Sequence, residues 1–385
     1  MMTLGERRDA FLQSIARLTA ERAAARDIVA GLRASSTEVW DWDIPSHWRT
    51  AGFVQELTST ASDVLESNPR ESLACAQLAL AVATSIPSGT YPSPVQAQIE
   101  GASWKEIGTA HRYMGEFDAA LRAYDAAQRS YAGANTLAHD AAVIELARAI
   151  VLADLDRHED ALRLLNSIAP VLRGFEDHRH LVQVRQLTAT IYYLQNRFDD
   201  ARVELEDAIN EVRFEDPYTR AGMTSTLGLI YGKLGRLDDS FRHIHKARAV
   251  FSDLGMTGEV NRNDWALATT VLEAGDYARA IEILRGVRNT FLSLSMSQEA
   301  GLAGLDLADA LIAGARMSEA RRVVEASLAQ FIAAKQNHNA ITAMAYLRDI
   351  LPTTSSPRKA VDHVKEYLRR LTFEPARVFF PPPEE

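Results

Sequence analysis

The sequence contains a single cysteine, Cys75, among its 385 residues. One thiol cannot form an intramolecular disulfide or a cysteine-based zinc site, and in the apolar run 72–83 we expect it to be buried and inert. The N-terminus, MMTLGERRDA, is charged from its first residues and does not resemble a secretory signal. The longest near-apolar run, 73–86, is shorter than the roughly 20 residues that cross a bilayer. We therefore expect a cytoplasmic protein without membrane contact.

Basic residues never cluster beyond a pair, and the formal net charge is −9. A protein that binds DNA or RNA normally carries a basic stripe, so we expect no nucleic-acid partner. Catalytic signatures are also missing: the sequence has no phosphate-binding loop, no GxGxxG, no HExxH and no GxSxG. We expect a protein that is not an enzyme and that needs no cofactor.

Proline is scarce between Val95 and Leu351, where only Pro170 and Pro217 occur. We predict that both follow the second helix of a helical pair, where a turn or a helix start tolerates proline. A chain of this length exceeds one ordinary hydrophobic core, which stops growing at about 250–300 residues. The composition, 47% apolar and 24% charged, is that of a folded protein. An all-α chain that grows by stacking units satisfies both observations.

A short phrase recurs through the chain, reading MGEFDAAL at 114–121, QNRFDDAR at 195–202 and LGRLDDSF at 234–241. Its small residue recurs at intervals of 41, 40, 39, 40 and 40 residues. A second small residue precedes each of these by twelve positions, and a small or apolar residue follows each by seven. The three series are Ala120, Ala161, Ala201, Ser240, Ala280 and Ala320; Gly108, Ala149, Ala189, Gly228, Ala268 and Ala308; and Ala127, Ile168, Ala208, Ala247, Val287 and Ser327.

Small residues in this phase are typical of paired antiparallel helices, which approach closely only where side chains are short. With Trp104, Gly108, Tyr124 and the alanines around them, the pattern over 101–340 resembles the tetratricopeptide repeat family. The period exceeds the 34 residues usual in that family. Such long repeats are similar to those of bacterial Rap-type peptide-receptor regulators and MalT-type activators. The resemblance implies a right-handed α-solenoid of tetratricopeptide-like hairpins.

The two ends of the chain extend the helical pattern. Residues 4–33 are expected to form one amphipathic helix, and helices at about 47–67 and 70–85 a degenerate first hairpin. Helices 339–350 and 357–371 form a predicted capping hairpin, since Ala360 keeps the phase. We predict a helical N-terminal region at 1–94 that ends in the proline-rich linker 86–94, a solenoid of six repeats and a cap at 95–372, and a tail at 373–385.

Aromatic residues gather near both ends. Trp40, Trp42 and Trp48 crowd around Pro45. In the tail, Val378, Phe379 and Phe380 are predicted to pack back on the last hairpin, and the alternative is an exposed tail that binds a partner.

Two pairs of histidines suggest a metal site at first sight, His178 with His180 and His243 with His245. His243 and His245 are two apart on a predicted helix and therefore point to different faces. No acidic or cysteine partner was found at chelating spacing. We expect solvated or packed histidines and no metal site.

In the tetratricopeptide family the first helices of the repeats line a concave groove that holds a peptide. This resemblance implies a partner-binding surface made of Lys105, Arg112, Tyr113, Gln183, Gln186, Tyr193, Lys233, Arg262, Trp265, Glu273 and Asp309. Four basic groups against Glu273, Asp309 and Asp154 predict a slightly positive surface, which suits a peptide with an acidic residue or a free carboxylate. The alternative is that these are ordinary polar residues of a solvated surface.

Two functions remain open. The first is an interaction scaffold or adaptor that binds a partner protein or peptide in the groove. The second is a signalling regulator, in which a bound peptide changes the superhelix and thereby controls another partner through the N-terminal region. The sequence does not indicate an oligomeric state.

Overall fold

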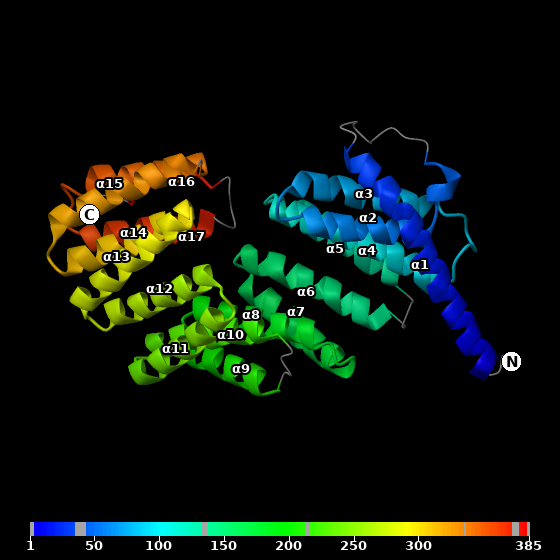
Figure 1. The fold of residues 1–385 in the computed structure, drawn as a ribbon, viewed down its shortest axis with the longest axis horizontal. Coiled ribbons are helices and arrows are strands. Elements are labelled where there is room, and N and C mark those ends of the chain that lie inside the picture. Colours follow the sequence, from blue (N-terminus) through cyan, green and yellow to red (C-terminus); the bar gives the residue numbers. More distant parts are fainter. Residues whose placement is uncertain are drawn as a thin grey trace. The chain divides into compact units, whose positions relative to one another are not determined.

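The computed structural model describes residues 4–34, 44–132, 137–211, 216–334, 336–371 and 377–382. Within these ranges the chain is all-helical, with seventeen α-helices and one 3₁₀ helix, η1 (Ser46–Trp48) (Figure 1). The chain divides into two compact units, Met1–Val184 and Arg185–Glu385. None of the described helices is long and apolar enough to cross a membrane.

The first unit holds α1 (Leu4–Ala34), α2 (Ala51–Val64), α3 (Pro69–Ser85), α4 (Ser93–Tyr113), α5 (Phe117–Tyr131), α6 (Ala138–Asp154) and α7 (His158–Gly174). The boundary between the units falls within α8 (His178–Leu194). The second unit continues with α9 (Phe198–Glu211), α10 (Pro217–Lys233), α11 (Leu237–Asp253), α12 (Thr257–Glu273), α13 (Tyr277–Ser293), α14 (Ser297–Ala313), α15 (Met317–Ala333), α16 (His338–Ile350) and α17 (Pro357–Leu371).

Successive helices pack as antiparallel pairs, which confirms the predicted stack of helical hairpins (Figure 1). In the first unit the pairs are α2 with α3, α4 with α5, and α6 with α7. The hairpin α2–α3 packs directly on α4, so the segment between α3 and α4 connects helices that touch. In the second unit α10, α12, α14 and α16 each pair with the helix that follows.

The three predicted series of small and apolar residues form the contact surface between helices. All of their members are buried. The first series has no exposed surface at all, from Ala120 to Ala320. Stability in such a stack comes from each hairpin covering the apolar face of its neighbour.

Two glycines of these series show why the residues must be small. A methyl group added at Gly108 would lie 2.5 Å from Cε1 of Tyr124, and one at Gly228 would lie 2.7 Å from Cγ1 of Ile244 and 3.1 Å from its backbone nitrogen. The partner at Gly228 includes backbone, which cannot rotate away. Helices α10 and α11 therefore approach more closely there than any larger side chain allows.

The turn inside each of the six repeats has one conformation. The second residue after the first helix takes a positive φ, at Gly115, Asp156, Asn196, Gly235, Gly275 and Ala315. The amide of the next residue returns to the carbonyl five positions back, as Arg236 does to Tyr231 at 2.9 Å, which is a Schellman motif. In four repeats that next residue is an arginine that binds an acid three positions on; these pairs are Arg157–Asp160, Arg197–Asp200, Arg236–Asp239 and Arg316–Glu319.

The prediction for Pro170 was wrong. Pro217 opens α10 as expected, but Pro170 lies inside α7. A proline within a helix removes one backbone hydrogen bond. Pro170 is exposed, so the carbonyl that loses its partner lies on the solvent side of α7. The prediction failed because it assumed that no position inside a helix tolerates proline, whereas an exposed helix face does.

Of the terminal aromatic residues, Trp48 is buried and stacks on Phe53 with ring centroids 5.1 Å apart. Trp40 and Trp42 lie outside the described residues. Only one of the three predicted tail residues packs back: Phe379 is 8% exposed, whereas Val378 and Phe380 are 58% and 74% exposed. Successive side chains of an extended segment point to opposite sides, so only the middle residue of the three, Phe379, faces the protein.

Two alanine substitutions in α10 test the close approach. Gly228→Ala should destabilise the protein by about 1–3 kcal/mol, because the new methyl group overlaps Ile244. Gly222→Ala, in the same helix, meets nothing within 4 Å and should stabilise by about 0.5–1 kcal/mol, since alanine is the better helix former. Thermal unfolding measures both. Equal effects of the two substitutions would contradict the packing described.

The buried phenol of Tyr124 predicts a loss of stability at high pH. Burial raises its pKa from the ordinary 10.0 to about 12, although Thr109 and Arg112 oppose the shift. The unfolded chain releases this proton near pH 10 and the folded chain only near pH 12. The contribution of the protonated phenol to the free energy of unfolding is therefore complete below pH 10 and is lost as the pH rises toward 12. Tyr124→Phe should flatten this part of the stability curve, measured by urea unfolding at each pH. An unchanged slope would show that Tyr124 is not the group responsible.

Candidate partner-binding surface

In the first unit, the predicted surface residues lie on α4 and reach toward α6. Arg112 Nη1 lies 3.3 Å from Oδ2 of Asp154, which ends α6 one repeat later. Burial raises the pKa of Asp154, and Arg112 opposes this shift. Lys105 pairs with its neighbour Glu106 at 2.8 Å. Tyr113 is 42% exposed, and the guanidinium of Arg112 lies 5.0 Å from its ring centre.

In the second unit, three predicted residues meet at the C-terminal ends of successive first helices. Lys233 of α10 forms an ion pair with Glu273 of α12. Tyr193 of α8 lies close enough to Lys233 for that cation to favour the ionised phenol, but burial raises the pKa of Tyr193 overall. Burial alone would lower the pKa of Lys233, but the bond to Glu273 raises it, so the amine stays charged. The phase argument therefore identified side chains that do meet.

The other predicted residues are engaged differently. Arg262 binds Glu259 of its own helix at 2.5 Å and Glu299 of α14 at 3.1 Å. The indole of Trp265 donates to Asp306 at 2.7 Å and packs edge-on against Phe291. Substitution of Trp265 would therefore disturb the packing between repeats as well as any binding surface. Gln183 of α8 is exposed and Gln186 is half-buried.

The prediction of a slightly positive surface is not supported by these contacts. Each of the four predicted cations has an acidic partner. The acidic residues that the prediction left out lie mainly at a neighbouring position in the sequence or in the next repeat. The four pairs are Lys105–Glu106, Arg112–Asp154, Lys233–Glu273 and Arg262–Glu299. The charges on the first helices serve largely to connect one repeat to the next.

The last helix of the chain, α17, covers the first helix of the sixth repeat. It packs on α14 as well as on its hairpin partner α16. The nine residues of α14 from Ala303 to Leu311 are all buried, because α13, α15 and α17 surround the helix. On α17 the apolar stripe Val361, Val364 and Leu368 is buried in the same core.

Two cations of α17 bind two carboxylates of α14. Arg358 holds Asp309 with both arms, Nε to Oδ1 at 2.6 Å and Nη2 to Oδ2 at 3.2 Å, and Asp309 is 4% exposed. Lys365 forms an ion pair with Asp306, which also accepts the indole proton of Trp265. Asp309, predicted to face a partner, is thus held by the chain's own C-terminal helix.

The amine of Lys365 keeps its charge in this polar cluster despite burial. Burial would lower the pKa of Lys365, but Asp306, Asp309 and Asp362 raise it above its usual value. Burial raises the pKa of Asp362, and the nearby carboxylate of Asp309 raises it further. The face of α14 is therefore acidic, and α17 supplies the matching cations.

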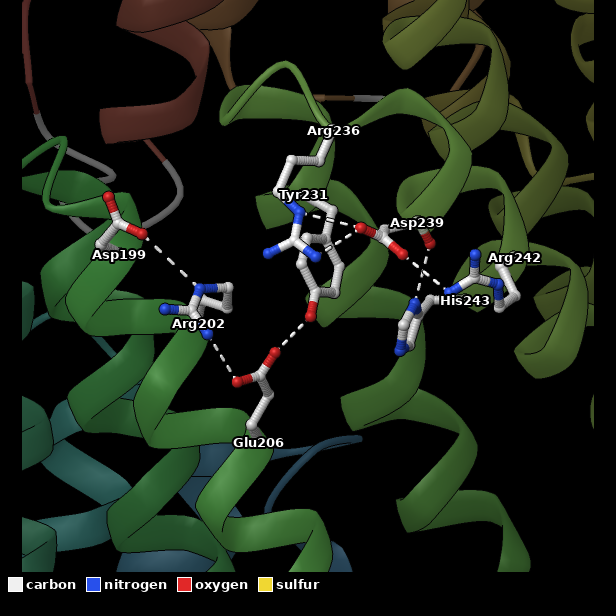
Figure 2. Close-up of polar contacts among 8 residues, drawn as sticks. All are labelled: Asp199, Arg202, Glu206, Tyr231, Arg236, Asp239, Arg242 and His243. Carbon is white, nitrogen blue, oxygen red and sulfur yellow. Dashed lines mark hydrogen bonds and ion pairs between the residues drawn. The ribbon is translucent and has the colours of Figure 1, made fainter.

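A second polar cluster joins α9, α10 and α11 (Figure 2). Glu206 accepts hydrogen bonds from Arg202 at 2.6 Å and from the phenol of Tyr231. The guanidinium of Arg236 stacks on Tyr231 at 4.5 Å, and Arg236 binds Asp239 at 2.8 Å. Burial and the bond to Glu206 raise the pKa of Tyr231, so the phenol stays protonated. The polar groups of this cluster are paired with one another, and the cluster connects one repeat to the next.

In the same cluster, Nδ1 of His243 donates to the backbone oxygen of Asp239, 2.8 Å away, and the ring faces Tyr231 (Figure 2). His245 is exposed. The two histidines point to different faces, as predicted.

Sequence reasoning missed the residues that come from distant positions. Asp306 lies on the covered face of α14, and Arg358 and Lys365 lie on α17, which the sequence predicted only as a cap. A signal was present: in PRKAVDHVKEYLRRL the apolar residues follow one helical face and the basic residues flank it. A cap that faces only the end of a stack needs one apolar face, but not cations spaced along the helix.

Comparison with known proteins supports the fold. No protein-family model matches this sequence, and no curated protein matches it. Among solved structures, the apo form of RapI has a TM-score of 0.53 at 12% identity, over 71% of this chain and 98% of RapI. Aspartyl phosphate phosphatase F from Bacillus subtilis has a TM-score of 0.53 at 14% identity, over 71% of each chain.

A third similar structure is a signal transduction ATPase with numerous domains from Pyrococcus horikoshii, whose sensor is built of tetratricopeptide repeats. Its TM-score is 0.53 at 14% identity, over 86% of this chain and 54% of that one. The protein is therefore a tetratricopeptide-like helical repeat protein that resembles Rap proteins in fold. At these identities the likeness establishes the fold alone.

Two substitutions in α17 test its seat on α14. Arg358→Ala leaves the buried carboxylate of Asp309 without its partner and should destabilise the contact by about 1–3 kcal/mol. Arg370→Ala removes only a pair with Glu366, in which both side chains are more than 40% exposed, and should cost less than about 1 kcal/mol. Hydrogen exchange of the α17 amides in the full chain reports both changes. Equal acceleration by the two variants would contradict the assigned role of Arg358.

Proposed function

We propose that this protein acts by binding a partner protein or peptide along the first helices of its repeats, without catalysing a reaction. The observation that carries the proposal is the seat of α17. An amphipathic helix lies on the face of α14, with a buried apolar stripe and with cations on Asp306 and Asp309. Recognition of an amphipathic helix by a groove uses this combination of contacts.

The first helices of the first unit also present exposed side chains to a partner. Tyr113 is exposed at the end of α4, beside the pair of Arg112 and Asp154. Aromatic and arginine side chains are enriched where proteins recognise one another. We place the partner's first contact here, with Lys105 and Gln183 as further candidates.

Two points from the comparisons bear on this proposal. The repeats of the Pyrococcus horikoshii protein are described as a sensor, a role that depends on binding. One similar structure is a phosphatase, so the fold is compatible with catalysis in other chains. The non-enzymatic part of the proposal rests on the sequence, which contains none of the catalytic motifs sought in it.

A second candidate function is a partner-responsive regulator, and α17 is the specific observation that favours it. A segment that occupies a binding face competes with any external ligand for that face, so binding and release of α17 are coupled. The covered face is acidic, which favours a basic amphipathic helix as the competitor. In this version the region 1–94 transmits the change, the repeats at 95–372 receive the ligand, and the tail at 373–385 follows α17.

Photo-crosslinking of the full chain tests the proposed surface. A photoreactive amino acid at Tyr113, on the first helix α4, should capture a discrete protein from an extract of the source cells. The same amino acid at Arg122, exposed on the second helix α5 of the same hairpin, is the matched control and should not. Excess unlabelled wild-type chain should compete the adduct away. Equal capture at both positions, or capture at Arg122 alone, would show that the first helices are not the binding surface.

The captured partner then separates the two functions. If the protein is a regulator, saturating partner accelerates hydrogen exchange of the α17 amides, because the helix leaves α14. If it is a scaffold, exchange in α17 stays unchanged while exchange in α4 slows.

A further inference from the structure

Three potential metal ligands converge where α6 faces the start of α8. Nε2 of His139 and Nδ1 of His180 each lie 2.6 Å from the same carboxylate oxygen, Oδ2 of Asp177. All three ligand atoms lie within 4.8 Å of one another. His139 comes from the second repeat and the other two residues come from the start of the third, so the cluster joins two consecutive first helices within the first unit.

The backbone holds Asp177 in place before any ion binds. Its amide returns to the carbonyl of Leu172 at 3.0 Å in the turn that ends α7, and its own carbonyl accepts the amide of Leu181 at 3.0 Å. Its Oδ1 caps α8 by accepting the backbone amide of His180 at 3.1 Å. One carboxylate oxygen is therefore used by the helix, and Oδ2 is directed toward both imidazoles.

The two imidazole rings are also positioned by packing. The ring of Phe175 meets His139 edge-on, with centroids 5.3 Å apart. The rings of His139 and His180 are 6.2 Å apart and nearly perpendicular, which lets one nitrogen of each approach a common point. The side chains of His139, Asp177 and His180 are 33%, 14% and 25% exposed, so an ion can reach them from solvent.

We propose that His139, Asp177 and His180 form a zinc-binding site that clips α6 to α8. Two imidazole nitrogens and one carboxylate oxygen are a ligand set that Zn²⁺ takes in proteins, with a water molecule as the fourth ligand. Around Zn²⁺ at about 2.0–2.2 Å from each ligand, neighbouring ligand atoms lie about 3.3 Å apart. The observed 2.6 Å contacts therefore need to open by less than an ångström, which small rotations of these partly buried side chains provide.

The electrostatics of the site include one effect that disfavours a bound cation and one that favours it. Both histidines lie in the first turn of their helices, where the helix dipole disfavours a cation. The carboxylate of Asp177 offsets this effect, because its Oδ2 lies 2.6 Å from one nitrogen of each ring. Without an ion, the imidazoles and the carboxylate satisfy one another by hydrogen bonds.

Such a clip would add a connection between repeats that the other junctions make with ordinary ion pairs. At the corresponding level of the later repeats, Arg262 joins Glu259 to Glu299 by charge alone. Zinc at His139, Asp177 and His180 makes the stiffness of this one junction depend on metal supply, since ligand bound only by the folded state stabilises it.

Titration calorimetry of the full, untagged chain with Zn²⁺ after treatment with a chelator tests the proposal. The wild type should bind one ion per chain. His139→Ala and His180→Ala should each weaken binding at least about tenfold, because each removes a direct ligand. His178→Ala, on the same helix but outside the cluster, is the matched control and should bind like the wild type. Asp177→Asn keeps a residue that caps helices well, so it should fold normally and still bind Zn²⁺ at least about tenfold more weakly.

Cobalt spectroscopy gives a second measurement. Co²⁺ in the wild type should show the intense visible bands of four-coordinate geometry and lose them in His139→Ala, without the near-ultraviolet band of a bound thiolate, since Cys75 is buried elsewhere. The proposal fails if the wild type binds no Zn²⁺, if His178→Ala abolishes binding, or if the His139 and His180 variants bind as well as the wild type.

Discussion

The contact between two antiparallel helices through slim side chains is the constraint on which the rest of this structure depends. Alanine, serine and glycine at two phased positions, with small or apolar residues at a third, let each helix lie against the next, and a methyl group added at Gly228 would lie only 2.7 Å from Cγ1 of Ile244. Because the contact recurs about every forty residues, the first helices of successive repeats contact one another within each unit, as α4 does with α6 and α12 with α14. The rows of charged and aromatic side chains on the first helices follow from that spacing.

The polar contacts between repeats obey the same spacing. Lys233 meets Glu273 forty residues later, and Arg112 meets Asp154 forty-two residues later. Charges that look like a free recognition surface in one repeat are therefore neutralised by the next. The surface left for a partner consists of exposed positions such as Tyr113, while the acidic face of α14 is already held by α17.

The sequence predicted the repeat well because side-chain size at the helix contacts is a local property with a fixed period. It also placed the first-helix residues, since Tyr193, Lys233 and Glu273 do lie together. It failed where the outcome depends on the path of the chain in space. The return of α17 onto α14 brings Arg358 to Asp309 across 49 positions, and His139 meets Asp177 across 38. Neither pair can be found within a single helix. Asp177 and His180, however, are three positions apart at the start of α8, so the prediction that the histidines have no acidic partner at chelating spacing was wrong. Pro170 was misplaced because its cost depends on which face of α7 is exposed.

The central claim is that the first helices of the repeats are the surface through which this protein acts. Hydrogen exchange across the whole chain, with and without a saturating bound partner, tests it most directly. The account predicts that protection gained on binding falls on peptides from first helices, with α4 and α8 foremost, while α5 and α7 are unchanged. Protection confined to the second helices, in a chain whose fold is intact, would contradict it.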